Sequence, residues 1–396
     1  MEQYEKQLQA AVRAFLRREP SPVLLTEQAD WVRLWRLAGE QSVLPIAADA
    51  LADCPALPEA VRREAMLSVM AQVRAADAFT RRYAALEQAG LTPLVVKGAV
   101  CRGLYPKPDL RPSADEDLLA PPGQARNIAA LLERAGMTVE NPDAEQVIAC
   151  RDGASGLYLE VHGTLFPASS EAYGSWNRFF NGAFDRRVFW KEAGVWTLCP
   201  QDHLLYLILH SLKHFLHSGF GVRQVCDICL FTAAYGGEVD WPALTAALDQ
   251  VHGRLFYANL LAMGREHLGI SGYPEQAEAW LAGMDTDCGD LLADLLSGGV
   301  YGGNTEQRKH SSRITLSAVT GEGRTGPGRL LRTLFPRGRD LTGTYPWLKG
   351  RPWLTPAAWA VRLLRYGRRS SGSDARESVS IGERRVALLK KYGVIP

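Results

Sequence analysis

The chain has 396 residues, 46% of them hydrophobic and 22% charged, a balance typical of a folded globular protein with two or three domains. This composition excludes a disordered chain, a collagen-like fibre and a disulfide mini-protein, and no apolar stretch reaches the ~18 residues of a membrane-spanning helix. The N-terminus lacks the pattern of a secretion signal, and the seven cysteines show no framework spacing. The sequence therefore predicts a cytoplasmic protein with reduced thiols.

The net charge of +2 conceals an uneven distribution. From Arg324 to the C-terminus there are 16 basic and 4 acidic residues, a local charge of +12, so the remainder carries −10. A basic tail suits a phosphate-rich substrate, a nucleic acid or an anionic membrane surface. The acidic body is also a docking partner for the tail within the same chain, and we do not favour nucleic acid.

Helical periodicity dominates both ends of the chain. Residues 2–18, 27–51 and 58–88 carry apolar side chains at helical spacing, which predicts three helices. From about residue 200 onward the pattern is again mainly helical. We therefore divide the chain into an N-terminal helical region (1–90), a central core (91–196), a helical C-terminal domain (197–323) and a basic helical tail (324–396).

The central core changes to a strand-like pattern. The predicted strands are residues 92–96, 114–119 and 157–162, which are short, apolar or β-branched runs bounded by turn residues. A helix over 124–135, ended by Gly136, separates the second strand from the third. These elements predict a small sheet with flanking helices.

Three carboxylates in these strands suggest a metal site. Asp115 and Asp117 are two residues apart on a strand, so their side chains point to the same face. Glu160 lies in an apolar strand, where an unpartnered buried carboxylate is costly. Mg²⁺ bound to a nucleotide takes one or two carboxylates together with water and phosphate oxygens. Asp-x-Asp pairs also occur in ordinary loops, so the strand context carries this hypothesis.

Lys97 and Gly98 lie at the predicted turn from the first strand into a helix. Glycine allows backbone amides to approach a phosphate closely, and a helix N-terminus favours negative charge. The Lys97 ammonium would add a positive charge to the same place. A Lys-Gly pair is more often a simple turn, so this motif is weak alone.

Together these residues resemble the bacterial uncharacterised nucleotidyltransferase family of the DNA-polymerase-beta-like superfamily. The resemblance includes the helical N-terminal region and extends to the tail. The motifs that carry it are Val95-Val96-Lys97-Gly98-Ala99, Leu104-Tyr105-Pro106, Arg111-x-Ser113-x-Asp115-x-Asp117-Leu118-Leu119, Leu159-Glu160-Val161-His162 and His210-x-x-Lys213-His214.

The resemblance implies an α+β fold, with a small mixed sheet embedded in a predominantly helical chain. It also implies transfer of a nucleoside monophosphate from a nucleoside triphosphate to an acceptor hydroxyl or phosphate, with release of pyrophosphate. Asp115, Asp117 and Glu160 would be the catalytic and metal-binding acids, for Mg²⁺ or Mn²⁺. The acceptor, whether a small molecule, a peptide or RNA, is not specified. The expected nucleotide-binding residues are Lys97, Gly98, Arg111, Ser113, Lys213 and His214, and His162 is a further candidate.

Two alternatives to this enzyme remain at the sequence level. Glu116 stands between the two aspartates, where the superfamily usually has an apolar residue, and this favours a degenerate copy acting as a nucleotide sensor or scaffold. The second alternative is a basic-tail adaptor for RNA or membrane, because Trp353 and Trp359 lie among several arginines.

Two further patterns have ordinary explanations. His210 and His214 have the i, i+4 spacing of metal ligands, but the glutamate of the zinc-protease motif is missing, so a cleft-lining helix is the better interpretation. Asp227 is predicted to form a buried pair with Arg223 nearby. Cys226 and Cys229 are predicted to be core thiols rather than a redox pair.

Overall fold

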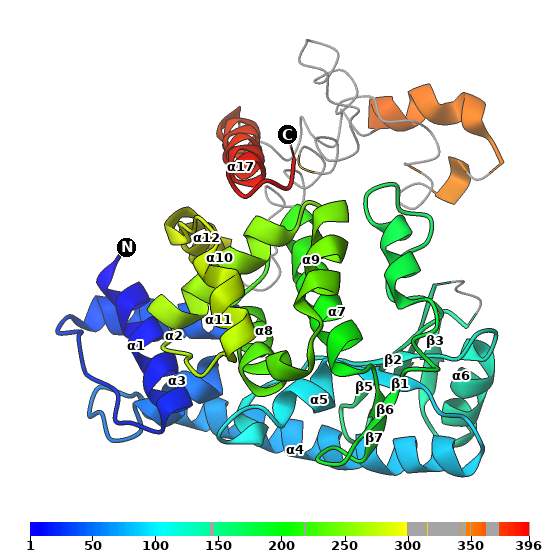
Figure 1. The fold of residues 1–396 in the computed structure, drawn as a ribbon, viewed down its shortest axis with the longest axis horizontal. Coiled ribbons are helices and arrows are strands. Elements are labelled where there is room, and N and C mark those ends of the chain that lie inside the picture. The colour runs from blue at the N-terminus through cyan, green and yellow to red at the C-terminus, as the bar shows by residue number, and fades with distance from the viewer. Residues whose placement is uncertain are drawn as a thin grey trace.

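The computed structural model describes residues 1–142, 146–217, 219–298, 315, 341, 346–348, 350–361 and 372–395. Its centre is a seven-stranded mixed sheet with helices around it, which confirms the predicted α+β class (Figure 1). The strands are β1 (Leu94–Val96), β2 (Glu116–Leu119), β3 (Thr138–Glu140), β4 (Val147–Arg151), β5 (Tyr158–His162), β6 (Val188–Trp190) and β7 (Val195–Thr197).

The sheet has the order β3-β4-β5-β2-β1-β7-β6. The pairs β2–β5 and β1–β7 are parallel, and the remaining neighbours are antiparallel. All three strands predicted from the sequence exist, although the second begins at Glu116, so that Asp115 immediately precedes it. The sequence pattern missed β3, β4, β6 and β7.

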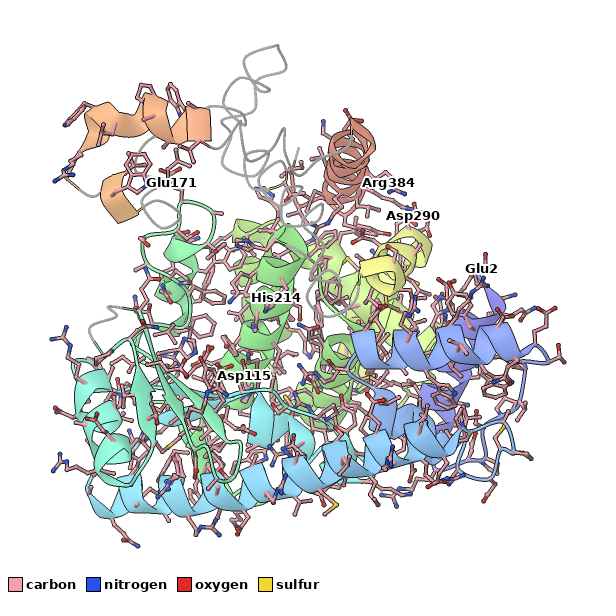
Figure 2. The ribbon with its side chains drawn as sticks, turned by 180° about the vertical axis from the view of Figure 1, so that it is seen from behind. Glu2, Asp115, Glu171, His214, Asp290 and Arg384 are labelled. Atoms are coloured by element: carbon pink, nitrogen blue, oxygen red, sulfur yellow. The ribbon has the colours of Figure 1, made fainter. Side chains whose placement is uncertain are left out.

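The N-terminal helices cover one end of the molecule. The predicted helix over 27–51 is wrong in one respect, because the chain breaks it into two near Ser42, whose φ is 54°. The long helix α4 runs along one side of the whole molecule, from the N-terminal helices to the sheet (Figure 1), and the view from behind shows the same arrangement (Figure 2). These helices are α1 (Gln3–Arg17), α2 (Gln28–Glu40), α3 (Leu44–Ala50) and α4 (Glu59–Gln88).

Two helices lie close to the central strands. Helix α5 (Gly98–Arg102) follows β1 directly, and α6 (Ala125–Arg134) joins β2 to β3 and packs on β4. Gly136 follows α6 with a φ of 90°, as predicted for its C-terminal cap. Short 3₁₀ turns occupy Pro108–Leu110, Gly174–Phe180, Gly236–Glu238, Pro346–Leu348 and Pro352–Leu354.

The C-terminal half of the described chain is helical, as predicted. Helix α7 is the central member and packs along α8. One continuous hydrophobic core joins these helices to the sheet and to the N-terminal helices. The helices are α7 (Pro200–His217), α8 (Val222–Tyr235), α9 (Trp241–Gln250), α10 (Arg254–Glu266), α11 (Glu275–Ala282), α12 (Gly289–Gly298) and α17 (Gly372–Lys391).

The end of the basic tail docks on the body of the protein. The buried Arg385 guanidinium donates a 2.7 Å hydrogen bond to the His217 carbonyl at the C-terminus of α7, where a cation is favourable. Lys391 Nζ pairs with Asp287 and Asp290 at 2.7 and 2.6 Å. These contacts agree with docking of the tail inside the chain. Residues 362–371, with most of the arginines near Trp359, lie outside the described residues.

None of the helices in the described part of the chain combines the length and the apolar composition needed to cross a bilayer. The division at residues 90, 196 and 323 stays a prediction.

Candidate active site

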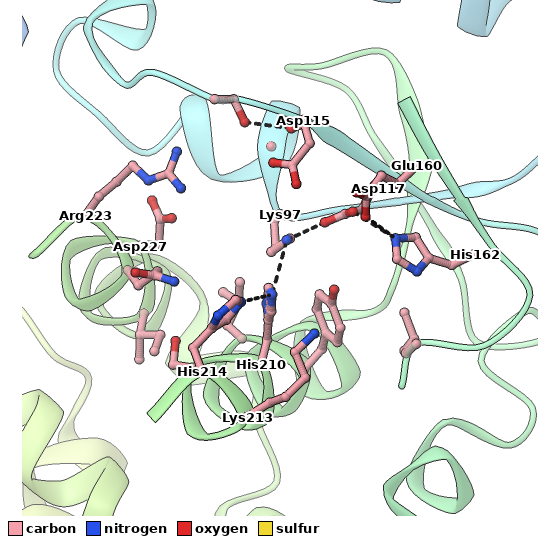
Figure 3. Close-up of a pocket in the computed structure, with 18 of the residues that line it drawn as sticks. Lys97, Asp115, Asp117, Glu160, His162, His210, Lys213, His214, Arg223 and Asp227 are labelled. Carbon is pink, nitrogen blue, oxygen red and sulfur yellow. Dashed lines mark hydrogen bonds and ion pairs between the residues drawn. The ribbon is translucent and has the colours of Figure 1, made fainter. Parts of the chain in front are cut away.

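A cavity of ≈ 280 Å³ lies between the central strands and the helices α7 and α8 (Figure 3). One wall carries carboxylates from β2 and β5, and the opposite wall carries basic side chains from α7. The cavity brings together every residue predicted for the site: Lys97, Gly98, Arg111, Ser113, Asp115, Asp117, Glu160, Lys213 and His214.

The acidic wall follows from the register of two parallel strands. Asp117 on β2 is paired with Glu160 on β5, so both carboxylates stand on the same face of the sheet. His162 lies between them: its Nε2 is 2.9 Å from Asp117 Oδ1 and 3.3 Å from Glu160 Oε2. Asp117, Glu160 and His162 place one potential ligand atom each within 4.8 Å of one another, with Asp115 beside them in the cavity.

The charges in this wall shift one another's pKa. Burial alone would raise the pKa of Asp117, but Lys97 and His162 override it and hold that pKa below its usual range. Burial would likewise lower the pKa of His162, yet hydrogen bonds to Asp117 and Glu160 raise it to about 9. Burial raises the pKa of Asp115, against the attraction of Lys97. Asp117 is therefore held more firmly in its ionised form than Asp115.

The donor set fits Mg²⁺ or Mn²⁺ through its oxygens. Both ions prefer carboxylates, and Asp115, Asp117 and Glu160 supply them at one end of the cavity. The imidazole nitrogen of His162 is a less suitable ligand for these ions. The hydrogen bond between His162 and Asp117 suits a histidine that orients a metal-binding carboxylate.

Lys97 occupies the tight turn between β1 and α5. Its φ of 61° and ψ of −119° are unusual for any residue other than glycine. The Lys97 amide donates to His203 Nε2 at 3.2 Å, and His203 Nδ1 lies 3.1 Å from Thr197 Oγ1 on β7. These two buried hydrogen bonds hold the turn in its strained conformation. The Lys97 ammonium forms an ion pair with Asp117.

Gly98 is required because a carboxylate fills the space next to it. A Cβ on Gly98 would lie only 1.8 Å from Glu116 Oε2. That oxygen accepts a 2.8 Å hydrogen bond from the Ala99 amide, and the other carboxylate oxygen contacts Arg102. Glu116 thus has a cation and a backbone partner inside the fold. The degenerate-copy interpretation loses the observation that motivated it.

The basic wall comes from α7, which confirms that this helix lines the cleft. His210 Nε2 lies 3.3 Å from Lys97 Nζ and 3.0 Å from His214 Nε2. Burial and the charge of Lys97 hold the pKa of His210 well below its usual value, and burial with Lys97 lowers the pKa of Lys213. An anion bound at this wall would favour the protonated forms of both side chains.

Tyr206 and His210 line the cavity but were not among the predicted site residues. The two rings stack on α7 with centroids 5.6 Å apart, and both line the cavity. The sequence did contain a signal for these two residues. Residues 206, 210 and 214 are spaced four positions apart, so on a helix they share one face with the predicted site residue His214.

Arg111 lines the cavity and is held by a buried carboxylate of α8. Its buried guanidinium forms two hydrogen bonds with Asp227, at 2.8 and 2.7 Å, and Tyr105 donates a third to the same carboxylate at 2.8 Å. Asp227 therefore pairs with Arg111. The predicted pair of Asp227 with Arg223 is wrong. Arg223 instead donates to the Pro112 carbonyl. Arg111 borders the cavity, but its main contact fixes the loop before β2 against α8.

Ser113 also shapes this loop. Its hydroxyl donates to the Asp115 carbonyl at 2.8 Å, and its amide donates to Gln72 Oε1 on α4 at 2.7 Å. These bonds hold the chain just before Asp115, so they position that carboxylate at the cavity.

The remaining cysteine and histidine clusters stay outside the site. Cys226 and Cys229 are fully buried in α8, as predicted for core thiols. Glu266, His267 and Cys288 form a second group of potential ligands. There the Cys288 thiol lies 3.7 Å from Glu266 Oε2, and burial raises its pKa to about 12, which disfavours the thiolate that a metal needs.

The comparisons with known proteins give one match. A family model described as uncharacterised nucleotidyltransferase matches residues 27–269, more than half of the chain. The matched range contains every residue that lines the cavity and ends before the basic tail. No curated protein and no solved structure matches the chain.

Proposed function

The chain belongs to the uncharacterised nucleotidyltransferase family, and on this premise we propose that it moves a nucleoside monophosphate from a nucleoside triphosphate to an acceptor hydroxyl or phosphate. The observation that carries the proposal is the pairing of Asp117 with Glu160 across β2 and β5, opposite the basic wall of α7. The acceptor is a small molecule, a peptide or RNA.

Asp115, Asp117 and Glu160 are the residues that would hold Mg²⁺ or Mn²⁺. When bound, the ion would neutralise the triphosphate and polarise the phosphate under attack. His162 keeps the Asp117 carboxylate oriented through their 2.9 Å contact. Both oxygens of Asp117 are engaged by Lys97 and His162, so this carboxylate is already positioned before any ligand binds.

The triphosphate binds between Lys97 and the basic wall. Lys97 at the N-terminus of α5, with Gly98 behind it, offers positive charge and a close backbone approach. From the other side, Lys213 on α7 neutralises phosphate charge and His214 donates a hydrogen bond to a phosphate oxygen. Ser113 and Arg111 act by holding the loop that carries Asp115.

In the transfer step the acceptor oxygen attacks the α-phosphorus while the bond from that phosphorus to the α–β bridging oxygen breaks. Pyrophosphate leaves with the bonding electrons, and the acceptor proton passes to a carboxylate. Glu160 is our choice for this base, because it is the most accessible of the paired acids at the cavity.

Calorimetric titration with ATP, CTP, GTP and UTP, each with and without Mg²⁺, tests the proposal without an acceptor. We expect one or more triphosphates to bind tightly only with Mg²⁺, and Asp117→Asn to lose this binding while keeping its thermal unfolding profile. Asp109→Asn, an exposed aspartate on the loop before β2, is the matched control. A folded wild-type protein that binds no triphosphate would contradict the proposal and favour the scaffold interpretation. Binding that ignores Asp117 would overturn the metal assignment.

A further inference from the structure

The outward face of α4 carries apolar side chains that the described chain leaves uncovered. Met66, Leu67, Met70 and Val73 are between 43% and 56% exposed. At about 100° of rotation per residue, these four positions lie within roughly 60° of Met70 on the helix surface. They form one stripe, which we call the α4 stripe.

The opposite face of α4 makes the contacts that hold the helix in place. Ala65, Phe79, Tyr83 and Leu86 are buried there, and Gln72 reaches the loop before β2. The helix therefore needs no further apolar residues on its outer side for packing. Contiguous exposed apolar residues of this kind mark an interaction surface.

Charged residues continue the α4 stripe in both directions. Glu59 and Arg63 stand before it, and Asp77 and Arg81 after it, all of them exposed. All four fall within roughly 20° of Met70 on the helix surface at 3.6 residues per turn. Arg81 and Asp77 form an ion pair with each other at this surface.

This arrangement is complementary to itself when the helix is inverted about Met70. An antiparallel second copy places Arg63 opposite Asp77, and Glu59 opposite Arg81. The same operation places Met70 against its own copy at the two-fold axis. Such an isologous contact is the usual form of a dimer interface. Arg74 is also exposed and lies within roughly 40° of Met70. With it the face carries three basic and two acidic side chains and is close to neutral, whereas a membrane-binding helix carries a marked excess of positive charge.

We propose that the α4 stripe is a homodimer interface, formed by two antiparallel α4 helices that cross at Met70. The helix has 30 residues and is about 45 Å long, and it runs along one side of the molecule in both views (Figure 2). Two copies can therefore meet along the outward face of α4. The candidate active site of each copy then lies on the other side of α4, away from the interface.

Sedimentation equilibrium of the full chain over a wide concentration range tests this proposal. We expect a monomer–dimer equilibrium, and we expect Met70→Glu to raise the dimer Kd by about 100-fold or more, as for a central interface residue. Val32→Glu is the matched control, since Val32 on α2 is 56% exposed but lies outside the stripe. A monomer at every concentration, or a dimer that Met70→Glu leaves intact, overturns the proposal.

Charge reversal tests the antiparallel register. Arg63→Asp and Asp77→Arg should each weaken the dimer by about tenfold, because like charges then face each other, and the double variant should restore it. Restoration requires the two positions to meet across the interface. Additive losses in the double variant would overturn the proposed register. Circular dichroism of each variant checks that α4 is still folded.

Discussion

Asp117 and Glu160 stand directly opposite each other across the parallel pairing of β2 and β5. Two carboxylates this close repel unless a cation lies nearby, and the fold supplies Lys97 and His162 for that purpose. Positive groups of the chain therefore stabilise the acidic wall before ligand binds. A metal ion entering the proposed site would compete with these groups for the same oxygens.

Glu160→Gln should reduce the effect of Mg²⁺ on nucleotide binding. Loss of one charged oxygen ligand is expected to weaken the Mg²⁺-dependent part of triphosphate affinity by at least about tenfold. Calorimetry with and without Mg²⁺ measures this part directly. Glu140→Gln on β3, where the carboxylate pairs with Arg151 at 3.1 Å, should leave it unchanged, and an equal loss in both variants would contradict the assignment.

Gly98→Ala should destabilise the fold. The new Cβ would collide with the Glu116 carboxylate, whose partners Ala99 and Arg102 hold it in place. The expected loss in free energy of unfolding is about 1–3 kcal/mol, as for overpacked cores, measured by urea denaturation. Gly39→Ala is the control, because a Cβ there meets nothing within 4 Å and α2 would gain a better helix former. A Gly98→Ala variant as stable as the wild type would refute this account of the glycine.

Asp227→Asn should cost about 3–5 kcal/mol at neutral pH, because it leaves the buried Arg111 without its counter-charge. Asp249→Asn removes an exposed ion pair with Arg254 and should cost less than about 1 kcal/mol. Chemical denaturation of both variants beside the wild type gives the comparison. Similar losses for the two variants would show that the buried pair is not a main source of stability.

The same pair predicts a pH dependence. Burial would raise the pKa of Asp227, but Arg111 lowers it below the ordinary value. A carboxylate with a lowered folded-state pKa contributes stability above its unfolded pKa of about 3.9. That contribution is lost as the pH falls through the folded-state pKa. The stability difference between wild type and Asp227→Asn should therefore be constant near neutral pH and shrink below about pH 4; a difference that grows on acidification would contradict this sign.

Lys213→Ala should weaken triphosphate binding by about tenfold to a hundredfold, the loss typical of a hydrogen bond to a charged group. Burial and Lys97 lower the pKa of Lys213, and a bound phosphate would favour its protonated form. The loss should be larger for a triphosphate than for a monophosphate. Lys191→Ala, at the exposed turn between β6 and β7, is the control, and an effect of the same size there would argue against a specific contact.

Local patterns were enough to predict the acidic wall. Asp117 and Glu160 belong to short strands that apolar or β-branched runs indicate, and Asp115 immediately precedes one of them. The Lys97-Gly98 turn is bounded by a clear change of periodicity. The strands β3 and β6 were missed because each has only three residues and is largely half-exposed, too short for the alternating pattern to show.

Contacts between distant residues were not accessible in this way. Arg111 and Asp227 are 116 positions apart in the chain, and only the packing of α8 against the loop before β2 brings them together. The motif around Arg111 therefore contains no sign of the carboxylate that holds this arginine. Glu116 was misleading for the same reason, because Arg102 and the Ala99 amide reach it only after α5 has turned back onto β2.

The parallel pairing of β2 with β5 also determines when the site can form during synthesis. Helix α6 and two further strands must be made before β5 can pair, so the acidic wall depends on contacts of high sequence separation, which form slowly. The basic wall on α7 follows later still, and β7 completes the other parallel pair just before it. A nascent chain that ends before α7 contains Asp117 and Glu160 but lacks the basic wall, so the proposed nucleotide site is complete only when the helical half has been added.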